Sequence, residues 1–427
     1  MPLAFLLLVA SQSVDTAGTG NALEHFAQSC RTAAQAIWGP SLCGPIALVD
    51  PRTRLVITNS ALPGAGLTAA GTVWTGRLPD SVLIANTAFR WQGTDIAMVM
   101  LPLPSDAFDR AALLAHESFH RIQKSLDLSA SDAPSLHLDS REGRTWLRLE
   151  VQALDYALTT RGPAQRRHIR AALLFRDHRR QLFAAAAAVE DSLEVQEGLA
   201  EYTGQFVASR HSPLAPLRSV RAIDAVMRQP SYVRSFAYAT GPAYGLLLDR
   251  LAPGWRRHVR STRSLTRLMH AAIGNDRTPP TDADLVATAG PYGYAGIASA
   301  ELQRETERNV QTAAVLQTLV AGPVLRLQQQ ELNRSFNPST LIAMDSLGVA
   351  YPTGEFSAAW GKLTVTEESD GALLAADFGL LRVAAPAPPA SMESRVLRGK
   401  GWVLELAEGW VAEAGERAGD LRVVRRR

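Results

Sequence analysis

One five-residue segment combines side chains that can bind a metal ion and move a proton. It reads HESFH from His116 to His120, within an apolar stretch at 111–122. If this stretch is helical, the two histidines lie four residues apart on one face, and both imidazoles can reach one ion. A catalytic zinc ion takes three protein ligands and leaves one position open for water. Glu117 follows the first histidine, so its carboxylate can reach that water and act as the general base.

A lone buried histidine usually does no more than satisfy a hydrogen bond. Two histidines with a glutamate between them, inside an apolar helix, favour a Zn²⁺ site instead. A third ligand must then lie downstream, and two glutamates are candidates: Glu197, in EGLAEY at 197–202, and Glu150. Glu150 shares a predicted helix face with apolar side chains, where a carboxylate is costly unless it is paired or bound to a metal. It has Leu154 at i+4 and could instead pair with a buried arginine or tyrosine.

Glu197 has a second acid, Glu201, at i+4. Two carboxylates on one helix face repel each other unless each has its own partner. Gly198 has no side chain, so we expect it to let this helix approach the metal helix closely.

A helix with HExxH followed by a helix with EGxAEY resembles the gluzincin clan of zinc metallopeptidases, which includes thermolysin-like enzymes. The resemblance covers about residues 95–250 and is specific at the two short motifs; the two termini are similar to those of a bacterial group within the clan. It implies Glu197 as the third ligand and Glu201 as the carboxylate that hydrogen-bonds a zinc-binding histidine. One departure is the gap of 77 residues from His120 to Glu197, longer than is usual in thermolysin-like members.

Hydrolysis also needs a hydrogen-bond donor aimed at the developing negative charge. Tyr238, in YATGPAY at 238–244, resembles an aromatic-glycine stretch after the third ligand in related enzymes, and Tyr202 and Tyr244 compete for this role. The strand expected at 96–101 lies directly before the metal helix. In gluzincins an edge strand in this place pairs with the substrate backbone; the alternative is an ordinary internal strand.

The elements that position these residues predict an α+β fold. Residues 23–44 look helical, short β-like runs follow up to Pro104, helices extend to about 310, and β-like runs return after that. With the resemblance, this implies a zincin-like catalytic core, made of a small sheet and a helical bundle, and a β-rich C-terminal domain. The expected divisions are 1–22 as a candidate signal segment, 23–104 as the N-terminal α/β part, 105–310 as the helical zinc-binding part and 311–427 as the C-terminal domain.

Charge and composition restrict the classes of molecule that this protein is expected to bind. The net charge of +3, from 44 basic and 41 acidic residues, is too small to indicate nucleic acid. The pairs Arg166-Arg167 and Arg179-Arg180 are interpreted as solvated helix faces. No segment reaches the roughly 20 apolar residues of a membrane span. The run from Leu3 to Ala10 suits the apolar region of a secretory signal, although no basic residue precedes it.

The two cysteines, Cys30 and Cys43, can form one disulfide in an oxidising compartment or remain as buried small side chains. These features favour a periplasmic or secreted protein over a cytoplasmic one. The expected function is zinc-dependent hydrolysis of peptide bonds in a peptide or protein substrate. The alternatives are a catalytically inactive zincin-like binding protein and a zinc hydrolase of a non-peptide substrate.

Overall fold

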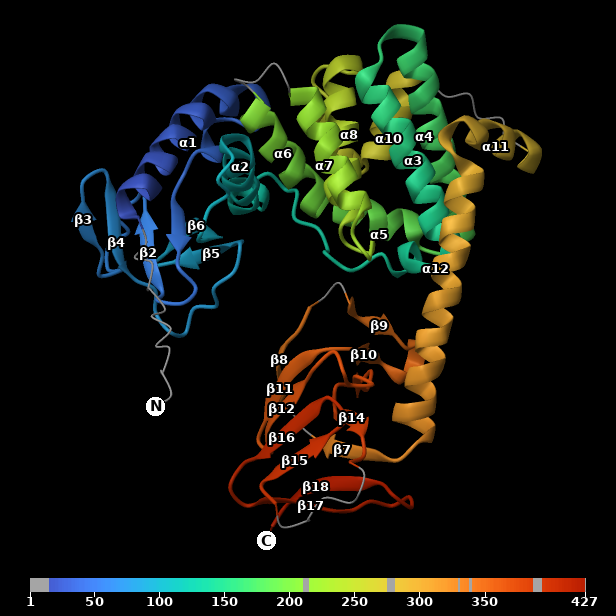
Figure 1. The fold of residues 1–427 in the computed structure, drawn as a ribbon. Coiled ribbons are helices and arrows are strands. Elements are labelled where there is room, and N and C mark those ends of the chain that lie inside the picture. The colour runs from blue at the N-terminus through green and yellow to red at the C-terminus, as the bar shows by residue number, and fades with distance from the viewer. Residues whose placement is uncertain are drawn as a thin grey trace, which may run out of the picture. The chain divides into compact units, whose positions relative to one another are not determined.

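The computed structural model describes residues 15–209, 215–274, 281–328, 331–337, 340–386 and 394–426 (Figure 1). It is a mixed α and β structure, 50% helical and 20% strand. The chain divides into two compact units, residues 1–297 and 298–427. The sequence pattern placed its last boundary at 310/311 instead, and the long helix α12 (Tyr294–Val315) spans both positions. Among the described residues, every helix is too short or too polar to cross a membrane.

The first unit begins with helix α1 (Thr16–Ile37), followed by a six-stranded sheet. The helix starts and ends seven residues before the predicted range of 23–44. The expected signal segment therefore overlaps α1 from Thr16 onward, while residues 1–14 lie outside the described residues. The strands are β1 (Ile46–Val49), β2 (Leu55–Thr58), β3 (Thr68–Ala70), β4 (Val73–Arg77), β5 (Thr87–Trp91) and β6 (Thr94–Met100).

Strand order decides between the two alternatives for 96–101, a substrate-binding edge strand and an internal strand, in favour of the internal one. The order is β3-β4-β2-β1-β6-β5, so β6 is internal and β5 is the edge strand. β6 pairs in parallel with β1 and antiparallel with β5. Its four central residues, Ile96 to Val99, are all buried because neighbours cover both faces: Ala97 and Val99 join the core under the helices, and Ile96 and Met98 join a second core on the opposite face.

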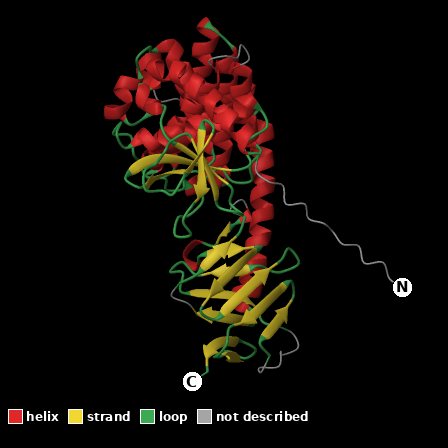
Figure 2. Cartoon of the chain, turned by 90° about the vertical axis from the view of Figure 1, so that its left-hand side faces the viewer, coloured by secondary structure: helices red, strands yellow, loops and turns green. Residues whose placement is uncertain are grey.

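The rest of the first unit is a helical bundle against this sheet (Figure 2). Its helices are α2 (Ala107–Gln123), α3 (Arg141–Thr159), α4 (Gly162–Leu182), α5 (Ala186–Leu193), α6 (Leu199–Ser209), α7 (Ala215–Met227), α8 (Phe236–Leu251), α9 (Arg256–Thr262), α10 (Leu265–Ile273) and α11 (Asp282–Ala289). Short turns of other helix types are η1 (Pro40–Leu42), η2 (Leu136–Asp139), the π-helical η3 (Glu194–Gly198) and η4 (Gly290–Tyr292). One continuous core joins α1, the sheet and the bundle.

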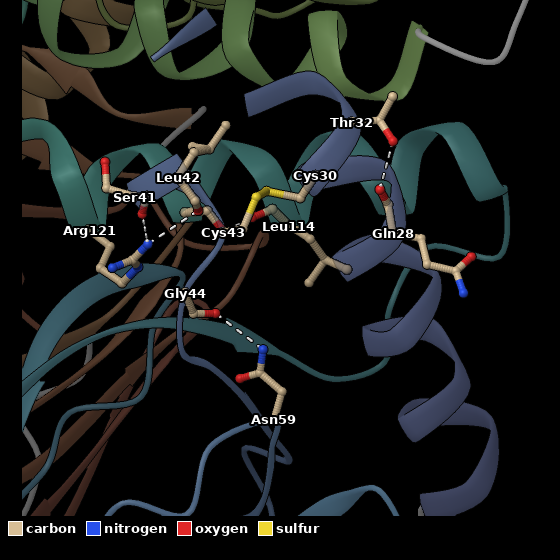
Figure 3. The surroundings of a disulfide bond; sticks show 11 residues. Gln28, Cys30, Thr32, Ser41, Leu42, Cys43, Gly44, Asn59, Leu114 and Arg121 are labelled. Atoms are coloured by element: carbon tan, nitrogen blue, oxygen red, sulfur yellow. Dashed lines mark hydrogen bonds between the residues drawn. A yellow bond between two sulfur atoms is a disulfide. The ribbon is translucent and has the colours of Figure 1, made fainter. Parts of the chain in front are cut away.

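A disulfide joins Cys30 of α1 to Cys43, which follows η1 (Figure 3). The same loop is tied to the helix that carries the histidines, because Arg121 of α2 donates hydrogen bonds to the carbonyl oxygens of Ser41 and Leu42. Cross-link and hydrogen bonds therefore hold α1, the η1 loop and α2 together.

The second unit contains two β-sheets that share one core. The seven-stranded sheet has the order β17-β18-β7-β14-β13-β10-β9, and the five-stranded sheet has the order β15-β16-β12-β11-β8. The strands are β7 (Val324–Gln328), β8 (Asn333–Ser335), β9 (Ile342–Ala343), β10 (Val349–Tyr351), β11 (Gly354–Ala358), β12 (Gly361–Val365), β13 (Ala372–Leu374), β14 (Leu380–Ala384), β15 (Val396–Gly399), β16 (Trp402–Leu406), β17 (Trp410–Ala414) and β18 (Leu421–Arg425). The turns η5 (Leu316–Ala321) and η7 (Asp345–Leu347) complete this unit. The predicted β-rich C-terminal region is therefore present.

Candidate metal centre

The histidines of the HESFH segment lie on one face of α2, as the i, i+4 spacing predicts. The helix begins where the carboxylate of Asp106 accepts hydrogen bonds from the amides of Phe108 and Asp109, at 2.9 and 3.1 Å. Such capping satisfies amide groups that have no partner inside a helix. Its apolar face, with Phe119 and Ile122, is buried in the core. The segment folds as a helix because a capped first turn and an apolar stripe agree in register.

Three donor atoms converge beside this helix. The Nε2 atoms of His116 and His120 lie 3.1 Å apart, and Glu197 Oε2 lies 3.6 and 3.4 Å from them. Ligands of a tetrahedral zinc ion with bonds of about 2.0–2.1 Å lie about 3.3–3.4 Å from one another. The three atoms therefore have the spacing of three corners of such a tetrahedron. Among the described residues, these three side chains are the group of histidine, cysteine or acid that could hold a metal ion.

The outer ring nitrogens of both histidines have acceptors. His116 Nδ1 lies 3.1 Å from Glu201 Oε2, and His120 Nδ1 lies 2.9 Å from Gln123 Oε1. Gln123 uses its Nε2 to donate to the carbonyl oxygens of Leu128, Val195 and Gln196, so its Oε1 must be the acceptor. Both imidazoles can then keep their proton on Nδ1, which leaves the two Nε2 lone pairs facing the point where the donors converge.

The charge balance of this group suits a cation. Burial opposes protonation of His116, but hydrogen bonds with Glu197 and Glu201 outweigh it and raise the pKa of His116 to about 10. Burial opposes ionisation of Glu197, yet the two histidines and Tyr238 hold its pKa below the usual range. The proton that His116 then holds balances part of the negative charge of Glu197 and Glu201. A divalent cation would supply the same charge at the centre of the donors.

Glu117 has an unsatisfied oxygen at this place. Its Oε2 is buried, and no hydrogen-bond partner for it lies among the described residues. Burial raises the pKa of Glu117 above its ordinary value. A buried carboxylate oxygen without a partner is costly, and a water in the open position of a metal ion would satisfy it.

Tyr238 is the one of the three candidate tyrosines that lies at this group. Its hydroxyl donates to Glu197 Oε2 at 2.7 Å, and its ring stacks on His116 with centroids 5.7 Å apart. Burial is the main reason why its pKa is raised, so it remains a donor. The other two hydroxyls donate elsewhere: Tyr202 to Asp249 and Tyr244 to Glu150.

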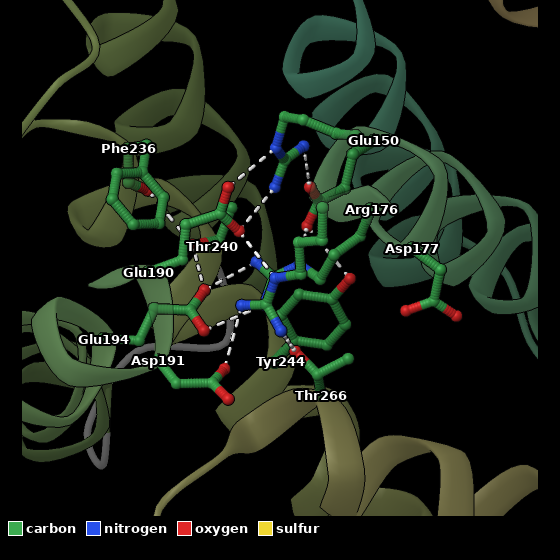
Figure 4. A network of polar contacts seen from close by, with 12 residues as sticks. Glu150, Arg176, Asp177, Glu190, Asp191, Glu194, Phe236, Thr240, Tyr244 and Thr266 are labelled. Atoms are coloured by element: carbon green, nitrogen blue, oxygen red, sulfur yellow. Dashed lines mark hydrogen bonds and ion pairs between the residues drawn. The ribbon is translucent and has the colours of Figure 1, made fainter. Parts of the chain in front are cut away.

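Glu150 does not lie with the histidines. Its Oε1 accepts from Arg176 at 2.6 Å and its Oε2 from Arg179 at 2.6 Å, inside a fully buried network of charges (Figure 4). The same arginines bind Glu194 and Glu190. The interpretation of Arg179-Arg180 as a solvated face was therefore wrong: Arg179 is fully buried and Arg180 nearly so, because three glutamates from other turns neutralise the arginines.

The π-helical turn η3 separates two glutamates that are three residues apart. Glu194 enters the buried network, where Thr240 of α8 donates to it at 2.5 Å, and Glu197 reaches the histidines. Gly198 packs on Gly241 of α8. A Cβ added to Gly241 would lie 2.3 Å from the Gly198 Cα. Gly198 thus serves the approach to α8. The close approach to α2, which was expected at Gly198, occurs at Gly204 instead. A Cβ added to Gly204 would lie 2.6 Å from the Ala112 carbonyl oxygen.

The group opens into a cavity of about 1240 Å³. Its walls include one face of α2, one face of α7 and Tyr238. They also include Thr87 and Ala88 at the start of edge strand β5, and Asn86 directly before it. Sequence reasoning missed both this strand and Gln123. Gln123 was detectable in principle, because it follows His120 by three residues on the same helix.

Comparisons with protein-family models, with curated proteins and with solved structures find no match to this chain.

Proposed function

We propose that this protein is a zinc-dependent peptidase with a gluzincin-like, zincin-type core. His116, His120 and Glu197 would hold the ion. The observation that carries the proposal is the tetrahedral spacing of their donor atoms, 3.1 to 3.6 Å, beside the unsatisfied carboxylate of Glu117. A bound zinc ion would act as a Lewis acid and lower the pKa of water from 15.7 to about 7.

The protein's own groups have separate roles in this proposal. Glu117, whose pKa is raised by burial, accepts the proton of the attacking water and passes it to the leaving amine. Glu201 and Gln123 hold the imidazoles in orientation. Tyr238 lines the cavity next to Glu197 and is the proposed hydrogen-bond donor to the carbonyl oxygen as it becomes negative.

The substrate is proposed to be an extended peptide paired with β5. This strand ends the sheet, and residues at its start line the cavity that holds the candidate ligands. An open strand edge binds a peptide through main-chain hydrogen bonds, largely independent of sequence. This arrangement favours a peptide over a small non-peptide substrate.

The decisive experiment compares metal content with hydrolysis. Purified protein supplied with zinc should hold about one ion per chain, and His116→Ala or His120→Ala should lose it. Glu117→Gln keeps the shape of the side chain but removes the base, so it should retain zinc and lose cleavage of a peptide library. Glu24→Gln, at an exposed position of α1, is the matched control and should retain both zinc and cleavage.

Three outcomes would contradict parts of this proposal. Wild-type protein that takes up no zinc would exclude the metal site. Equal cleavage by Glu117→Gln and wild type would exclude the proposed base. A zinc-loaded wild type that cleaves esters or no substrate at all would favour a non-peptide hydrolase or a binding protein.

We also infer that the protein is exported. The Cys30–Cys43 disulfide is of the kind that persists in oxidising compartments. Mature protein from the native host should begin after about Ser13, close to the Asp15 cap of α1. An intact Met1 together with two free thiols would place the protein in the cytoplasm instead.

A further inference from the structure

The seven-stranded sheet of the second unit carries three arginines side by side. Arg422 of β18 is in register with Arg326 of β7, and Arg326 is in register with Arg382 of β14. Residues in register across neighbouring strands point to the same face, with Cβ atoms about 4.5–5.5 Å apart in an antiparallel pair. The residues next to them in sequence, such as Leu325, Leu381 and Val383, fill the core between the sheets. The arginines therefore lie on the outer face.

Only one of these three guanidinium groups forms an ion pair among the described residues. Arg422 pairs with Glu413, which is in register with it on β17, at 2.7 Å. The side chains of Arg326 and Arg382 form no hydrogen bond or ion pair with any of the described residues. Like charges directly opposite each other on a sheet are destabilising. The sheet thus holds two neighbouring guanidinium groups that have no ion pair of their own.

Asp420 offsets only part of this repulsion, because it is engaged by other groups. Asp420 pairs with Arg417 at 2.9 Å and accepts a hydrogen bond from the Val324 amide at 3.0 Å. Burial, and then the charges of Arg326 and Arg417, lower the pKa of Arg382, and the opposing charge of Asp420 does not outweigh them.

The surroundings make the pair a partly enclosed site. Leu373 of β13 is in register with Arg382. It belongs to an apolar cluster with Val315 of α12 and Leu319 of η5. Arg326 and Arg382 are each only partly exposed. Two guanidinium groups beside an apolar rim, on rigid strands, are preorganised to bind a tetrahedral oxyanion through charge-assisted hydrogen bonds.

We propose that Arg326 and Arg382 form a binding site for a phosphate or sulfate group on the outer face of the second unit. The site is independent of the proposed zinc chemistry. Its ligand can be a free ion or the same group carried by a polymer, and the two sources share one chemistry: an oxyanion with several acceptor oxygens.

Calorimetric titration of the full chain with inorganic phosphate, at constant ionic strength set with chloride, tests the site. Arg326→Gln and Arg382→Gln should each weaken phosphate binding about tenfold or more, since each removes charge-assisted hydrogen bonds. Arg398→Gln is the matched control: it removes the same charge from an exposed position on β15 in the other sheet and should leave binding unchanged. Phosphate bound elsewhere, including at the histidines, remains in the double variant and can be subtracted.

Thermal unfolding gives a second, independent measurement. In chloride buffer, Arg326→Gln should raise the unfolding midpoint of the second unit by relieving repulsion, whereas Arg398→Gln should not. Phosphate should raise the midpoint of wild type and not that of the double variant. Tighter binding of dextran sulfate than of inorganic sulfate would identify a polymer as the ligand, and equal binding per group would identify the free ion. If wild type and the double variant respond equally to phosphate and to dextran sulfate, the site does not exist.

Discussion

Two side chains outside the proposed ligand set decide which nitrogen of each imidazole is free to bind zinc. Glu201 and Gln123 accept from the Nδ1 atoms, so the Nε2 atoms face each other. Glu201 comes from α6, whereas Gln123 belongs to α2 and is itself held by carbonyl oxygens of η3. Each imidazole is thus oriented from a different element.

Removing these supports should weaken zinc binding without abolishing it. Glu201→Ala and Gln123→Ala should each cost about 10–100-fold in zinc affinity, which is typical for partners of metal-binding histidines. Glu197→Ala should cost far more, because it removes a proposed ligand. Competition with a zinc chelator measures these affinities, with the exposed Gln28→Ala as control. A Glu201→Ala effect as large as that of Glu197→Ala would show that Glu201 is the ligand.

The residues of the candidate centre could be predicted where spacing along a helix brings them together. His116, Glu117 and His120 follow from one helical turn. The preference for Glu197 over Glu150 rested on the resemblance to gluzincins and on the second acid, Glu201, at i+4. The pairing of Glu150 could not be predicted, because Arg176 and Arg179 lie on a different helix, 26 and 29 residues away. An acid on an apolar helix face has the same pattern whether a metal or an arginine neutralises it.

At the scale of elements, the contact between η3 and α8 sets the direction of Glu197. Two hydroxyls of α8, from Tyr238 and Thr240, donate to Glu197 and Glu194 of the π-helical turn. The backbones of the two elements also approach each other closely at Gly198 and Gly241. A π-turn inside a helix is uncommon and frequently occurs at functional sites.

Gly241→Ala should therefore weaken zinc binding from outside the cavity. The new Cβ would meet backbone atoms of Gly198 at 2.3 to 2.7 Å, and backbone cannot rotate away as a side chain can. We expect a loss of about 1–3 kcal/mol in the free energy of unfolding, typical of overpacking, and at least tenfold weaker zinc binding. Gly296→Ala in α12 is the control, because open space surrounds it. Unchanged zinc affinity in Gly241→Ala would mean that this contact does not position Glu197.

The stability that the capped first turn of α2 contributes should depend on pH. The hydrogen bond from Arg218, together with those from first-turn amides, lowers the pKa of Asp106 from 3.8 to about 2. Since the folded pKa lies below the unfolded one, the ionised carboxylate stabilises the fold fully above pH 3.8, and this contribution is lost as the pH falls through about 2. Asparagine caps helices equally well but carries no charge. The urea midpoint of wild type should thus exceed that of Asp106→Asn at pH 5, and the difference should vanish near pH 2. If the difference in urea midpoint does not change with pH, the shape of the side chain and not its charge causes it.

The types of the main elements follow from hydrophobic periodicity, but their partners do not. The apolar run at 96–99 indicates a buried strand, and it is one. Whether that strand is internal or at the edge depends on β1, which pairs with it in parallel from about fifty residues upstream. No local pattern encodes such a long-range pairing, so both positions were left open for this strand, and β5 holds the edge.

At the scale of the whole molecule, the two units have separate apolar cores. The cores under the helices and behind the first sheet contain only residues up to 297, and those of the second unit contain only residues from Val315 onward. The helical and β-rich regions were predictable from the change of period. The division inside α12 was not, because a continuous helix gives no local signal of a boundary.

Two units with separate cores predict two calorimetric transitions with different ligand responses. Zinc should raise the midpoint temperature of the first unit's transition only, since a ligand stabilises only the fold that binds it. At a free zinc concentration of 100 Kd, the free energy of unfolding of this unit should increase by about 2.7 kcal/mol. Phosphate should raise only the other transition. Reductant should lower the zinc-sensitive transition, because Cys30 and Cys43 both belong to the first unit; a Cys30→Ala/Cys43→Ala variant should show no such response. A single transition that zinc and phosphate both raise would mean that the units unfold as one, and a zinc effect confined to the phosphate-sensitive transition would place the metal in the second unit.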